Sequence, residues 1–262
     1  MVTTSFLDYI PIWALYILTF LVALLAFELG YRYGMFQQKK SKRKLEVGLD
    51  SMVGATLALL AFLLAFVISL ATERFDNRRQ LVVDEATAIH TTYLQAGYLP
   101  EPYPNEIRAL LREYIGLRLT VTSAANIDET IARSEEIQKE LWSMAEAVVK
   151  EVPARDEISL FLASLNEVIN VHTKRVAAVL TSRLPSTVVL MLYLVAVLSM
   201  TMVGFQHSYS GKRNLFSILI LILIFTAVIM LIIDLDRPQE GFLRVSQEAL
   251  IDVQRQIGIW KP

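Results

Sequence analysis

Four stretches of the chain are almost uniformly apolar. They cover residues 10–27, 52–71, 184–205 and 215–233, and each is close to the roughly 20 residues that a helix needs to cross a bilayer. Aromatic residues flank the first stretch, as is typical of membrane interfaces: Tyr9, Trp13 and Tyr16 lie at one end, and Tyr31 and Tyr33 at the other. Since no basic segment precedes it and no small-residue cleavage site follows it, we expect a retained membrane helix and not a signal peptide.

Between the second and third apolar stretches, hydrophobic residues recur at helical spacing. Phe75, Val82 and Ile89 repeat every seven residues, and Ala86 and Tyr93 fall on the same stripe. No Pro occurs between residues 52 and 96, and the one Gly is Gly54, so the second span should run without a break into an extramembrane helix. Further helices are predicted over residues 105–121, from Asn126 (an N-cap, with Glu129 at the capping-box position) to about 148, and over 156–184.

These elements predict an all-α membrane protein: four transmembrane helices plus an extramembrane antiparallel helical bundle between spans two and three, its outer two helices continuous with the spans. The expected parts are residues 1–50 (first span and basic loop), 51–71 (second span), 72–183 (bundle), 184–234 (third and fourth spans) and 235–262 (amphipathic C-terminal helix). The apolar face of the last helix, expected over residues 241–260, comprises Leu243, Leu250, Val253, Ile257 and Trp260. It should pack on the bundle or lie in the membrane interface.

The composition agrees with a membrane protein and excludes several functions. Hydrophobic residues make up 54% of the 262 residues and charged residues 19%, against about 45–50% and 25% in soluble domains. The net charge of −1 provides no basic field for nucleic acid, and a chain without cysteine has no thiolate metal site or cysteine nucleophile. The sequence contains no HExxH, no phosphate-binding glycine loop and no serine nucleophile elbow. We therefore expect no enzyme activity and no cofactor.

The three histidines lie in different segments. His90 and His172 fall on the two helices predicted to continue from the membrane, so they either approach each other as a pH-sensing or metal-binding pair or each occupy one polar position of a helical interface. The second alternative is favoured. His207, beside the short loop between the last two spans, is expected to be solvated.

The short loops predict the orientation in the membrane. Arg32 and the cluster Lys39, Lys40, Lys42, Arg43 and Lys44 follow the first span, and Lys212 and Arg213 separate the last two. Because basic loops stay cytoplasmic, the N-terminus, residues 72–183 and the C-terminus should be non-cytoplasmic. The expected location is the bacterial inner (plasma) membrane, as a multi-pass protein.

Charged residues gather where the bundle meets the membrane. The expected cluster consists of Glu73, Arg74, Asp76, Arg78, Arg79, Asp84, Arg175, Arg183, Asp234, Asp236 and Arg237. The first alternative is an ion pathway, in the form of a charged vestibule or of an oxygen-ligand cation site built from Glu73, Asp76, Asp234 and Asp236. The second alternative is a set of interfacial ion pairs that fix the orientation of the helices. Ion pairing is the more economical explanation for any single pair.

The interior of the spans contains few ionisable residues. Glu28 and Asp234 both lie at helix ends, so an ion-coupled carrier is disfavoured. Small and hydroxyl residues such as Gly54, Thr56, Ser69, Ser199, Thr201 and Thr226 either line an aqueous path or allow close helix packing, and packing is the usual role.

Four separated segments, in order, resemble a known family. They read LLAFLLAFVISLATERFDNRRQLVVDEATAIHTTYLQAGYLPEP, LREYIGLRL, LNEVINVHTKRVAAVLTSRLP and DLDRPQEGFLRVSQEAL, and they span residues from about 50 to the C-terminus. This pattern resembles the bacterial inner-membrane family with a bestrophin-like domain. Bestrophins are oligomeric anion channels, so the resemblance implies a channel. It also implies a cytoplasmic region between spans two and three, opposite to the orientation that the charge pattern predicts.

Two functions follow from these patterns. The first is a homo-oligomeric ion channel in which several copies surround an axis, the second spans line a pore and the boundary charges form a vestibule. The second is a non-conducting scaffold or sensor whose bundle binds a partner. In either case membrane lipid and further copies of the chain are the expected partners, ions are possible partners of the channel, and nucleic acid is not expected.

Overall fold

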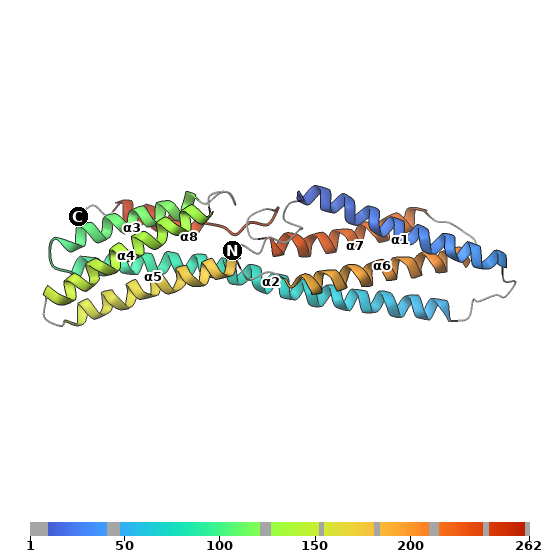
Figure 1. Ribbon diagram of the computed structural model, residues 1–262, viewed down its shortest axis with the longest axis horizontal. Helices are drawn as coiled ribbons and strands as arrows, with labels where there is room; N and C mark the ends of the chain where they lie inside the picture. The colour runs from blue at the N-terminus through green and yellow to red at the C-terminus, as the bar shows by residue number, and fades with distance from the viewer. Residues whose placement is uncertain are drawn as a thin grey trace. The chain divides into compact units, whose positions relative to one another are not determined.

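The computed structural model describes residues 10–40, 48–120, 127–151, 155–180, 184–209, 215–237 and 241–259. These residues form eight α-helices and one short 3-10 helix, and no β-strand occurs among them (Figure 1). They group into two compact units: Met1–Arg74 with Arg183–Leu243, and Phe75–Ser182 with Arg244–Pro262. The predicted all-α fold is therefore confirmed.

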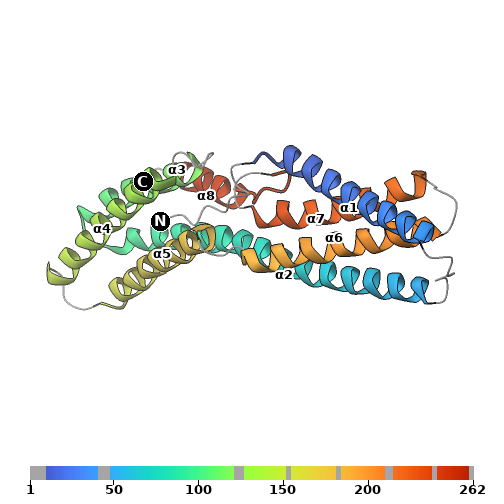
Figure 2. The ribbon, with the colours of Figure 1, turned by 45° about the vertical axis from the view of Figure 1, so that its right-hand side comes forward.

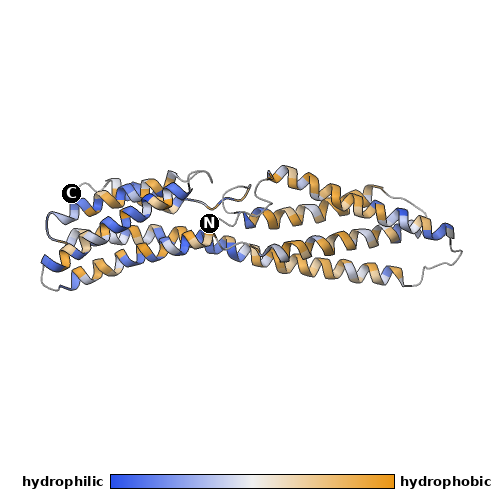
Figure 3. Cartoon of the chain, in the orientation of Figure 1, coloured by the Kyte–Doolittle hydropathy of each residue, from blue (hydrophilic) through white to orange (hydrophobic). Residues whose placement is uncertain are grey.

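The first unit, here called the membrane unit, contains the apolar helices. They are α1 (Ile12–Lys40), the first part of α2 (Leu49–Gln95), α6 (Ser186–Tyr209) and α7 (Leu215–Asp236). All four helices are long and apolar enough to cross a membrane, and Figure 3 shows their predominantly hydrophobic colouring. α1 packs against both α6 and α7. It also runs beyond the predicted apolar stretch, so Glu28 lies within the helix, where it pairs with Arg32 at 2.9 Å.

Glycines bring α1 and α6 into close contact. A Cβ added to Gly204 would collide with the backbone oxygen of Phe27, and one added to Gly30 would collide with the backbone oxygen of Thr201. The same pair of helices shares a hydrogen bond between the hydroxyls of Thr19 and Tyr193, 2.8 Å apart. At this interface small residues therefore serve close packing, as they usually do in membranes.

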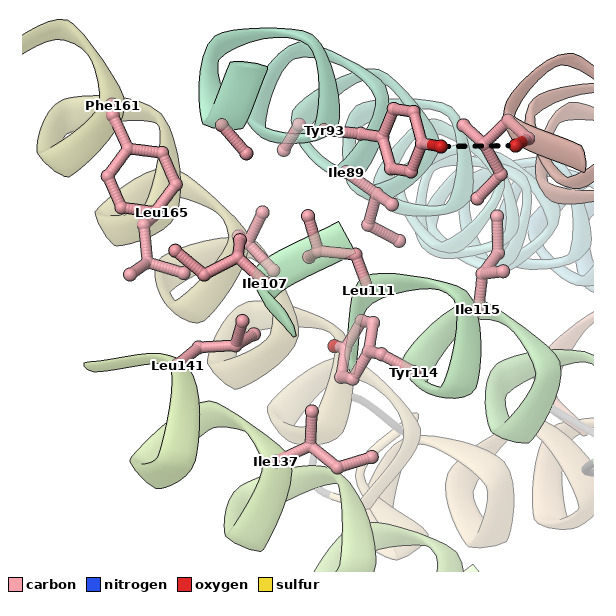
Figure 4. Close-up of a cluster of buried hydrophobic side chains, with 14 of the residues drawn as sticks. Ile89, Tyr93, Ile107, Leu111, Tyr114, Ile115, Ile137, Leu141, Phe161 and Leu165 are labelled. Atoms are coloured by element: carbon pink, nitrogen blue, oxygen red, sulfur yellow. Dashed lines mark hydrogen bonds between the residues drawn. The ribbon is translucent and has the colours of Figure 1, made fainter. Parts of the chain in front are cut away.

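The second unit, here called the bundle, contains the amphipathic helices. They are the remainder of α2 from Phe75, the 3-10 helix η2 (Ala96–Tyr98), α3 (Tyr103–Thr120), α4 (Ile127–Glu151), α5 (Asp156–Leu180) and α8 (Glu248–Ile259) (Figure 2). Their apolar stripes meet in one core, for which Ile89, Leu111, Ile137, Phe161 and Leu165 are representative (Figure 4). Each helix thus buries the face that its hydrophobic periodicity predicts.

The prediction that the second span continues into a bundle helix is confirmed. The prediction that the last long helix of the bundle continues into the third span is wrong. α2 is a single helix of 47 residues that ends just before Gly97. In contrast, α5 ends at Leu180 and α6 begins at Ser186. Leu184 precedes Pro185, a position that disfavours helical backbone, and its N–H donates to Asp236 Oδ1 at 2.8 Å. The predicted N-cap Asn126 and the residues 181–183 lie outside the described residues.

The C-terminal helix packs on the bundle, which was one of the two expected placements, and it is shorter than expected. It begins at Glu248 and not near Gly241. Leu250, Val253 and Ile257 are buried in the bundle core, and the Tyr93 hydroxyl donates to the Ile257 carbonyl at 3.3 Å. Leu243 precedes the helix and is 40% exposed, while Trp260 lies outside the described residues. The buried stripe is therefore shorter than the predicted one.

Candidate functional site

A buried polar network occupies the interior of the bundle. At its centre Glu85, on α2, is fully buried. Its Oε1 lies 3.0 Å from Arg118 Nε and accepts a hydrogen bond from the Tyr114 hydroxyl at 2.8 Å. Its Oε2 accepts from Arg175 Nη1. One carboxylate thus connects α2 with α3, which carries Tyr114 and Arg118, and with α5, which carries Arg175.

The Tyr114 hydroxyl connects this carboxylate to further groups. It lies 3.0 Å from His172 Nδ1 and accepts from Gln138 Nε2, on α4, at 3.4 Å. Because the single hydroxyl proton is donated to Glu85, Nδ1 must carry the imidazole proton and donate it to Tyr114. The other nitrogen, His172 Nε2, is then an acceptor, and it is buried with no hydrogen-bond partner among the described residues.

Arg175 extends the network to the last helix. Its Nη2 donates to Gln247 Oε1 at 3.0 Å, and Gln247 directly precedes α8. Glu85 therefore links, directly or through one side chain, residues from every long helix of the bundle as well as the segment that leads into α8. Such a largely buried arrangement acts as a cross-link between helices.

The positions of these residues follow from helical periodicity. Glu85 lies three residues after Val82 and four before Ile89, on the apolar stripe of α2. Arg118 lies seven residues after Leu111 on α3. In the same way His172 and Arg175 lie four and seven residues after Val168 on α5. Polar residues on apolar stripes are the signal that the sequence offers for this network.

Sequence reasoning placed three members of the network without bringing them together. Glu85 and Arg175 were placed among the charges near the membrane boundary, and His172 at a polar position of a helical interface. Tyr114, Arg118, Gln138 and Gln247 were not candidate site residues. Apart from Gln138, every member of the network falls within the four segments that carry the family resemblance. The stripe positions would have indicated that these polar groups are buried, but periodicity alone does not say which helices meet at the same level.

The electrostatics of the network keep His172 neutral. Burial lowers the pKa of His172 to about 4, and the neighbouring Arg118 and Arg175 act in the same direction against the opposing effect of Glu85. For Glu85, in the bundle part of α2, burial alone would raise the pKa, but Arg118 and Arg175 outweigh it and the pKa is lowered. Burial and the Glu85 charge raise the pKa of Tyr114, so its hydroxyl stays a donor. One carboxylate, two guanidiniums and a neutral imidazole therefore share this interior.

This charge state predicts that acid destabilises the bundle. Between pH 6.5 and about 4 the unfolded chain binds a proton at His172 that the folded chain does not bind, so stability falls as pH falls through this window. The contribution of Glu85, whose ordinary pKa is 4.5, is lost only at lower pH. We expect the melting temperature of the protein to decrease from pH 7 to pH 5, measured by thermal unfolding in detergent.

Histidine variants separate this effect from other titrations. His172→Asn retains a donor near the Nδ1 position and should flatten the dependence between pH 7 and pH 5. His90→Gln is the matched control, because His90 is half-buried on the same unit and lies outside the network, so this variant measures the contribution of a histidine elsewhere in the bundle. An equally steep dependence in His172→Asn would contradict the assignment.

For His90 and His172 a direct pair was the less favoured of the two expected alternatives, and His207 was expected to be solvated. Glu85, not His90, is the α2 residue that meets His172. Five residues correspond to about 500° of rotation, so the His90 side chain leaves α2 in a direction about 140° away from Glu85. His207 is half-buried and not simply solvated, because its ring packs edge-on against Phe27 with centroids 5.7 Å apart.

The predicted boundary charges fall into two environments. On α2, Glu73, Asp76 and Arg79 are exposed, Arg74 is half-buried and Arg78 is buried. Asp84 accepts from Gln80 at 2.8 Å on the same helix. Arg183 lies outside the described residues. The exposed members of this group are the ones that can act on ions in solution.

At the end of α7 the charged side chains bind backbone groups. Asp234 is buried, and its two carboxylate oxygens accept the N–H groups of Phe242 at 2.9 Å and Leu243 at 3.0 Å. Asp236 accepts from Leu184, and Arg237 Nη2 donates to the Ile10 carbonyl at 2.8 Å. Within the described ranges no group of three or more acidic or histidine side chains is arranged to hold a metal ion. Asp234 and Asp236 therefore stabilise the backbone of neighbouring segments by accepting hydrogen bonds from their N–H groups.

Four membrane helices and a helical bundle with a buried polar network define an α-helical integral membrane protein. The family model for the Bestrophin-like domain matches residues 17–250, which include α2, α6 and α7, all but the first turn of α1, and every member of the network. The chain thus belongs to the Bestrophin-like domain family, and the resemblance seen in the sequence is confirmed.

Solved structures share the fold. A membrane protein crystallised as a point variant matches with a TM-score of 0.67 and 16% identity over 92% of this chain and 97% of that chain. A variant of a bacterial Bestrophin homolog from Klebsiella pneumoniae matches with a TM-score of 0.65 and 16% identity over 94% of this chain and 98% of that chain. At these identities the likeness establishes the fold alone. No curated protein matches the sequence.

Proposed function

We propose that this protein is a homo-oligomeric ion channel of the bacterial inner membrane. The observation that carries the proposal is the family match over residues 17–250, because this one continuous range covers nearly all of the four membrane helices and the bundle up to the start of α8. Bestrophins, which this family resembles, are oligomeric channels.

The outward surface of α2 supports assembly of several copies. Its exposed positions include a line of small residues, Gly54, Ala58, Ala61, Ala65 and Ser69. Small residues on one face allow helices to approach closely in a membrane. A helix with such a face is better suited to contact another copy, or to lie beside a central axis, than to contact lipid alone.

The test of conduction is ion flux into liposomes that contain the purified protein. We expect flux to depend on the protein and to require an assembly of several copies. The size of the particle in detergent reports whether the copies are assembled. An assembled protein without flux for either cations or anions would favour the alternative function, a non-conducting scaffold or sensor.

The exposed boundary charges are proposed as the vestibule. Asp76→Asn should shift the ratio of cation to anion permeability by about twofold or more, because an exposed carboxylate changes the local ion concentration, and it should leave the melting temperature unchanged. Asp252→Asn removes an exposed carboxylate from α8 and is the matched control. Asp236 is unsuitable for this test because its carboxylate holds the Leu184 N–H. Equal selectivity in the Asp76 and Asp252 variants would contradict a vestibule at Asp76.

The proposed orientation places the basic loop in the cytoplasm and the bundle outside it. Single cysteines at Lys39, which is exposed near the end of α1, and at Ala132, which is exposed on α4, can be probed in intact cells with an impermeant thiol reagent. Ser134, on α4 one turn before Gln138, is unsuitable as a labelling position, because it is fully buried and a cysteine there would not react with the reagent. We expect labelling at position 132 and none at 39; the reverse would place the bundle in the cytoplasm, as in bestrophins.

A further inference from the structure

A short loop after α7 holds one aromatic side chain away from the protein. Phe242 is 91% exposed, the highest value for any large hydrophobic residue described. Its backbone is nevertheless fixed, because Asp234, itself only 5% exposed, accepts the N–H groups of both Phe242 and Leu243. Gly241 has a φ of +151°, and a Cβ at this residue would collide with Asp234 Oδ1. The loop is therefore built to present Phe242 in a set position.

The loop lies at the same end of the membrane unit as the start of α1. The Cδ1 atom of Ile12 is 3.5 Å from the position that a Gly241 Cβ would occupy. The Arg237 guanidinium binds the Ile10 carbonyl next to it, and both views of the ribbon show the beginning of α1 beside the end of α7 (Figures 1 and 2). Trp13, on the first turn of α1, is 67% exposed.

The outward face of α1 indicates what surrounds this end. Up to Leu29 its exposed residues are bulky and apolar, and one line of them repeats every four positions: Trp13, Ile17, Leu21, Leu25 and Leu29. Such a stripe, with no small or polar member, is a surface for lipid chains, whereas small residues are typical of contacts between membrane helices. The apolar part of α7 ends at the charged residues Asp236 and Arg237, a change in polarity that is typical of the membrane boundary, and aromatic side chains are enriched at that level.

We propose that the loop 241–243 is a bilayer anchor: Phe242, held by Asp234 and Gly241, inserts into the interfacial region of membrane lipid next to Trp13. A fixed loop inserts without losing further backbone freedom, which makes a single aromatic residue an effective anchor. The anchor continues the lipid-facing stripe of α1 at its end. Its role is to set the depth of the membrane unit in the bilayer, independently of whether the protein conducts ions.

Because the chain contains no cysteine, a spin label at one introduced cysteine reports the surroundings of Phe242. The label is placed on Phe242→Cys in liposomes of phosphatidylethanolamine and phosphatidylglycerol, and its accessibility to oxygen and to a water-soluble nickel complex is measured. Leu21→Cys, exposed on α1, is the lipid reference, and Asp252→Cys, exposed on α8, is the water reference. We expect an oxygen-to-nickel ratio at position 242 several-fold above that at 252 and nearer to that at 21.

Two results would overturn the proposal. A ratio at position 242 equal to that at 252 would place the loop in water. A label shielded from both reagents, whose spectrum sharpens when labelled protein is diluted with unlabelled protein, would place it against a second copy.

The role of Asp234 is tested on the same label. Asp234→Ala in the Phe242→Cys background removes both acceptors and should make the label more mobile and lower its oxygen-to-nickel ratio. Asp236→Ala is the matched control, since the Asp236 carboxylate accepts from the Leu184 N–H. If Asp234→Ala does not assemble, Asp234→Asn, which keeps one acceptor oxygen, should give an intermediate effect. An unchanged label in an assembled Asp234 variant would show that the loop does not depend on this carboxylate.

Discussion

Glu85→Gln is expected to destabilise the bundle by about 3–5 kcal/mol, the cost of removing one member of a buried ion pair. The substitution keeps the shape of the side chain but removes the negative charge that Arg118 and Arg175 share. Glu85 is fully buried and Arg118 is 7% exposed, so water cannot replace the lost partner. Thermal unfolding in detergent should show a melting temperature lower by several degrees.

An exposed ion pair provides the control for Glu85. Glu113, also on the bundle, pairs with Arg133 at 2.7 Å, and both side chains are more than a third exposed. Glu113→Gln should therefore change the melting temperature little, because exposed ion pairs contribute little to stability. Adding Arg118→Met to Glu85→Gln removes one stranded cation and should restore part of the loss. A Glu85→Gln protein as stable as the wild type would contradict the central place of this carboxylate.

Gly204→Ala is expected to separate α1 from α6. The added methyl group would collide with the Phe27 carbonyl, a backbone atom that cannot rotate away. Inserting an atom into a packed interface costs about 1–3 kcal/mol, and more where the backbone must move. We expect a lower melting temperature and less assembled protein extracted from the membrane.

Gly116→Ala is the matched substitution for Gly204. Gly116 lies on α3, in the bundle, and a Cβ there meets no atom within 4 Å. The added methyl group should not lower stability, so a normal yield of Gly116→Ala beside a reduced yield of Gly204→Ala would identify the α1–α6 contact as the cause. Equal yields of the two variants would show that α1 and α6 can move apart without loss.

The helices were predictable because their signals are local. Uniform apolar stretches identify spans, and the absence of Pro and Gly after Gly54 predicts the long α2, which the structure confirms. The end of α5 was not predicted, although Pro185 made a break at Leu184 the expected outcome. Phe242, within the segment expected to be helical, instead donates its N–H to Asp234, a residue of another helix, and periodicity carries no information about such a contact.

The buried network was only partly predictable for a related reason. Glu85 and Arg175 are 90 positions apart, and helical spacing shows only that each falls on a buried face. Whether they meet depends on the registers of α2 and α5, which are set by the whole core. The sequence therefore placed Arg175 at the membrane boundary among exposed charges, where a guanidinium is expected by default.

The docking of α8 has a consequence for the order of events during synthesis. The apolar residues that α8 contributes to the core, Leu250, Val253 and Ile257, leave the ribosome after α7, and Gln247, the partner of Arg175, does so too. The bundle can therefore be completed only once the fourth span has been made. Until then the part of the core that α8 covers stays open, which is the condition in which a nascent chain is most prone to aggregate. Membrane insertion and closure of the bundle are thus sequential steps in the production of this protein.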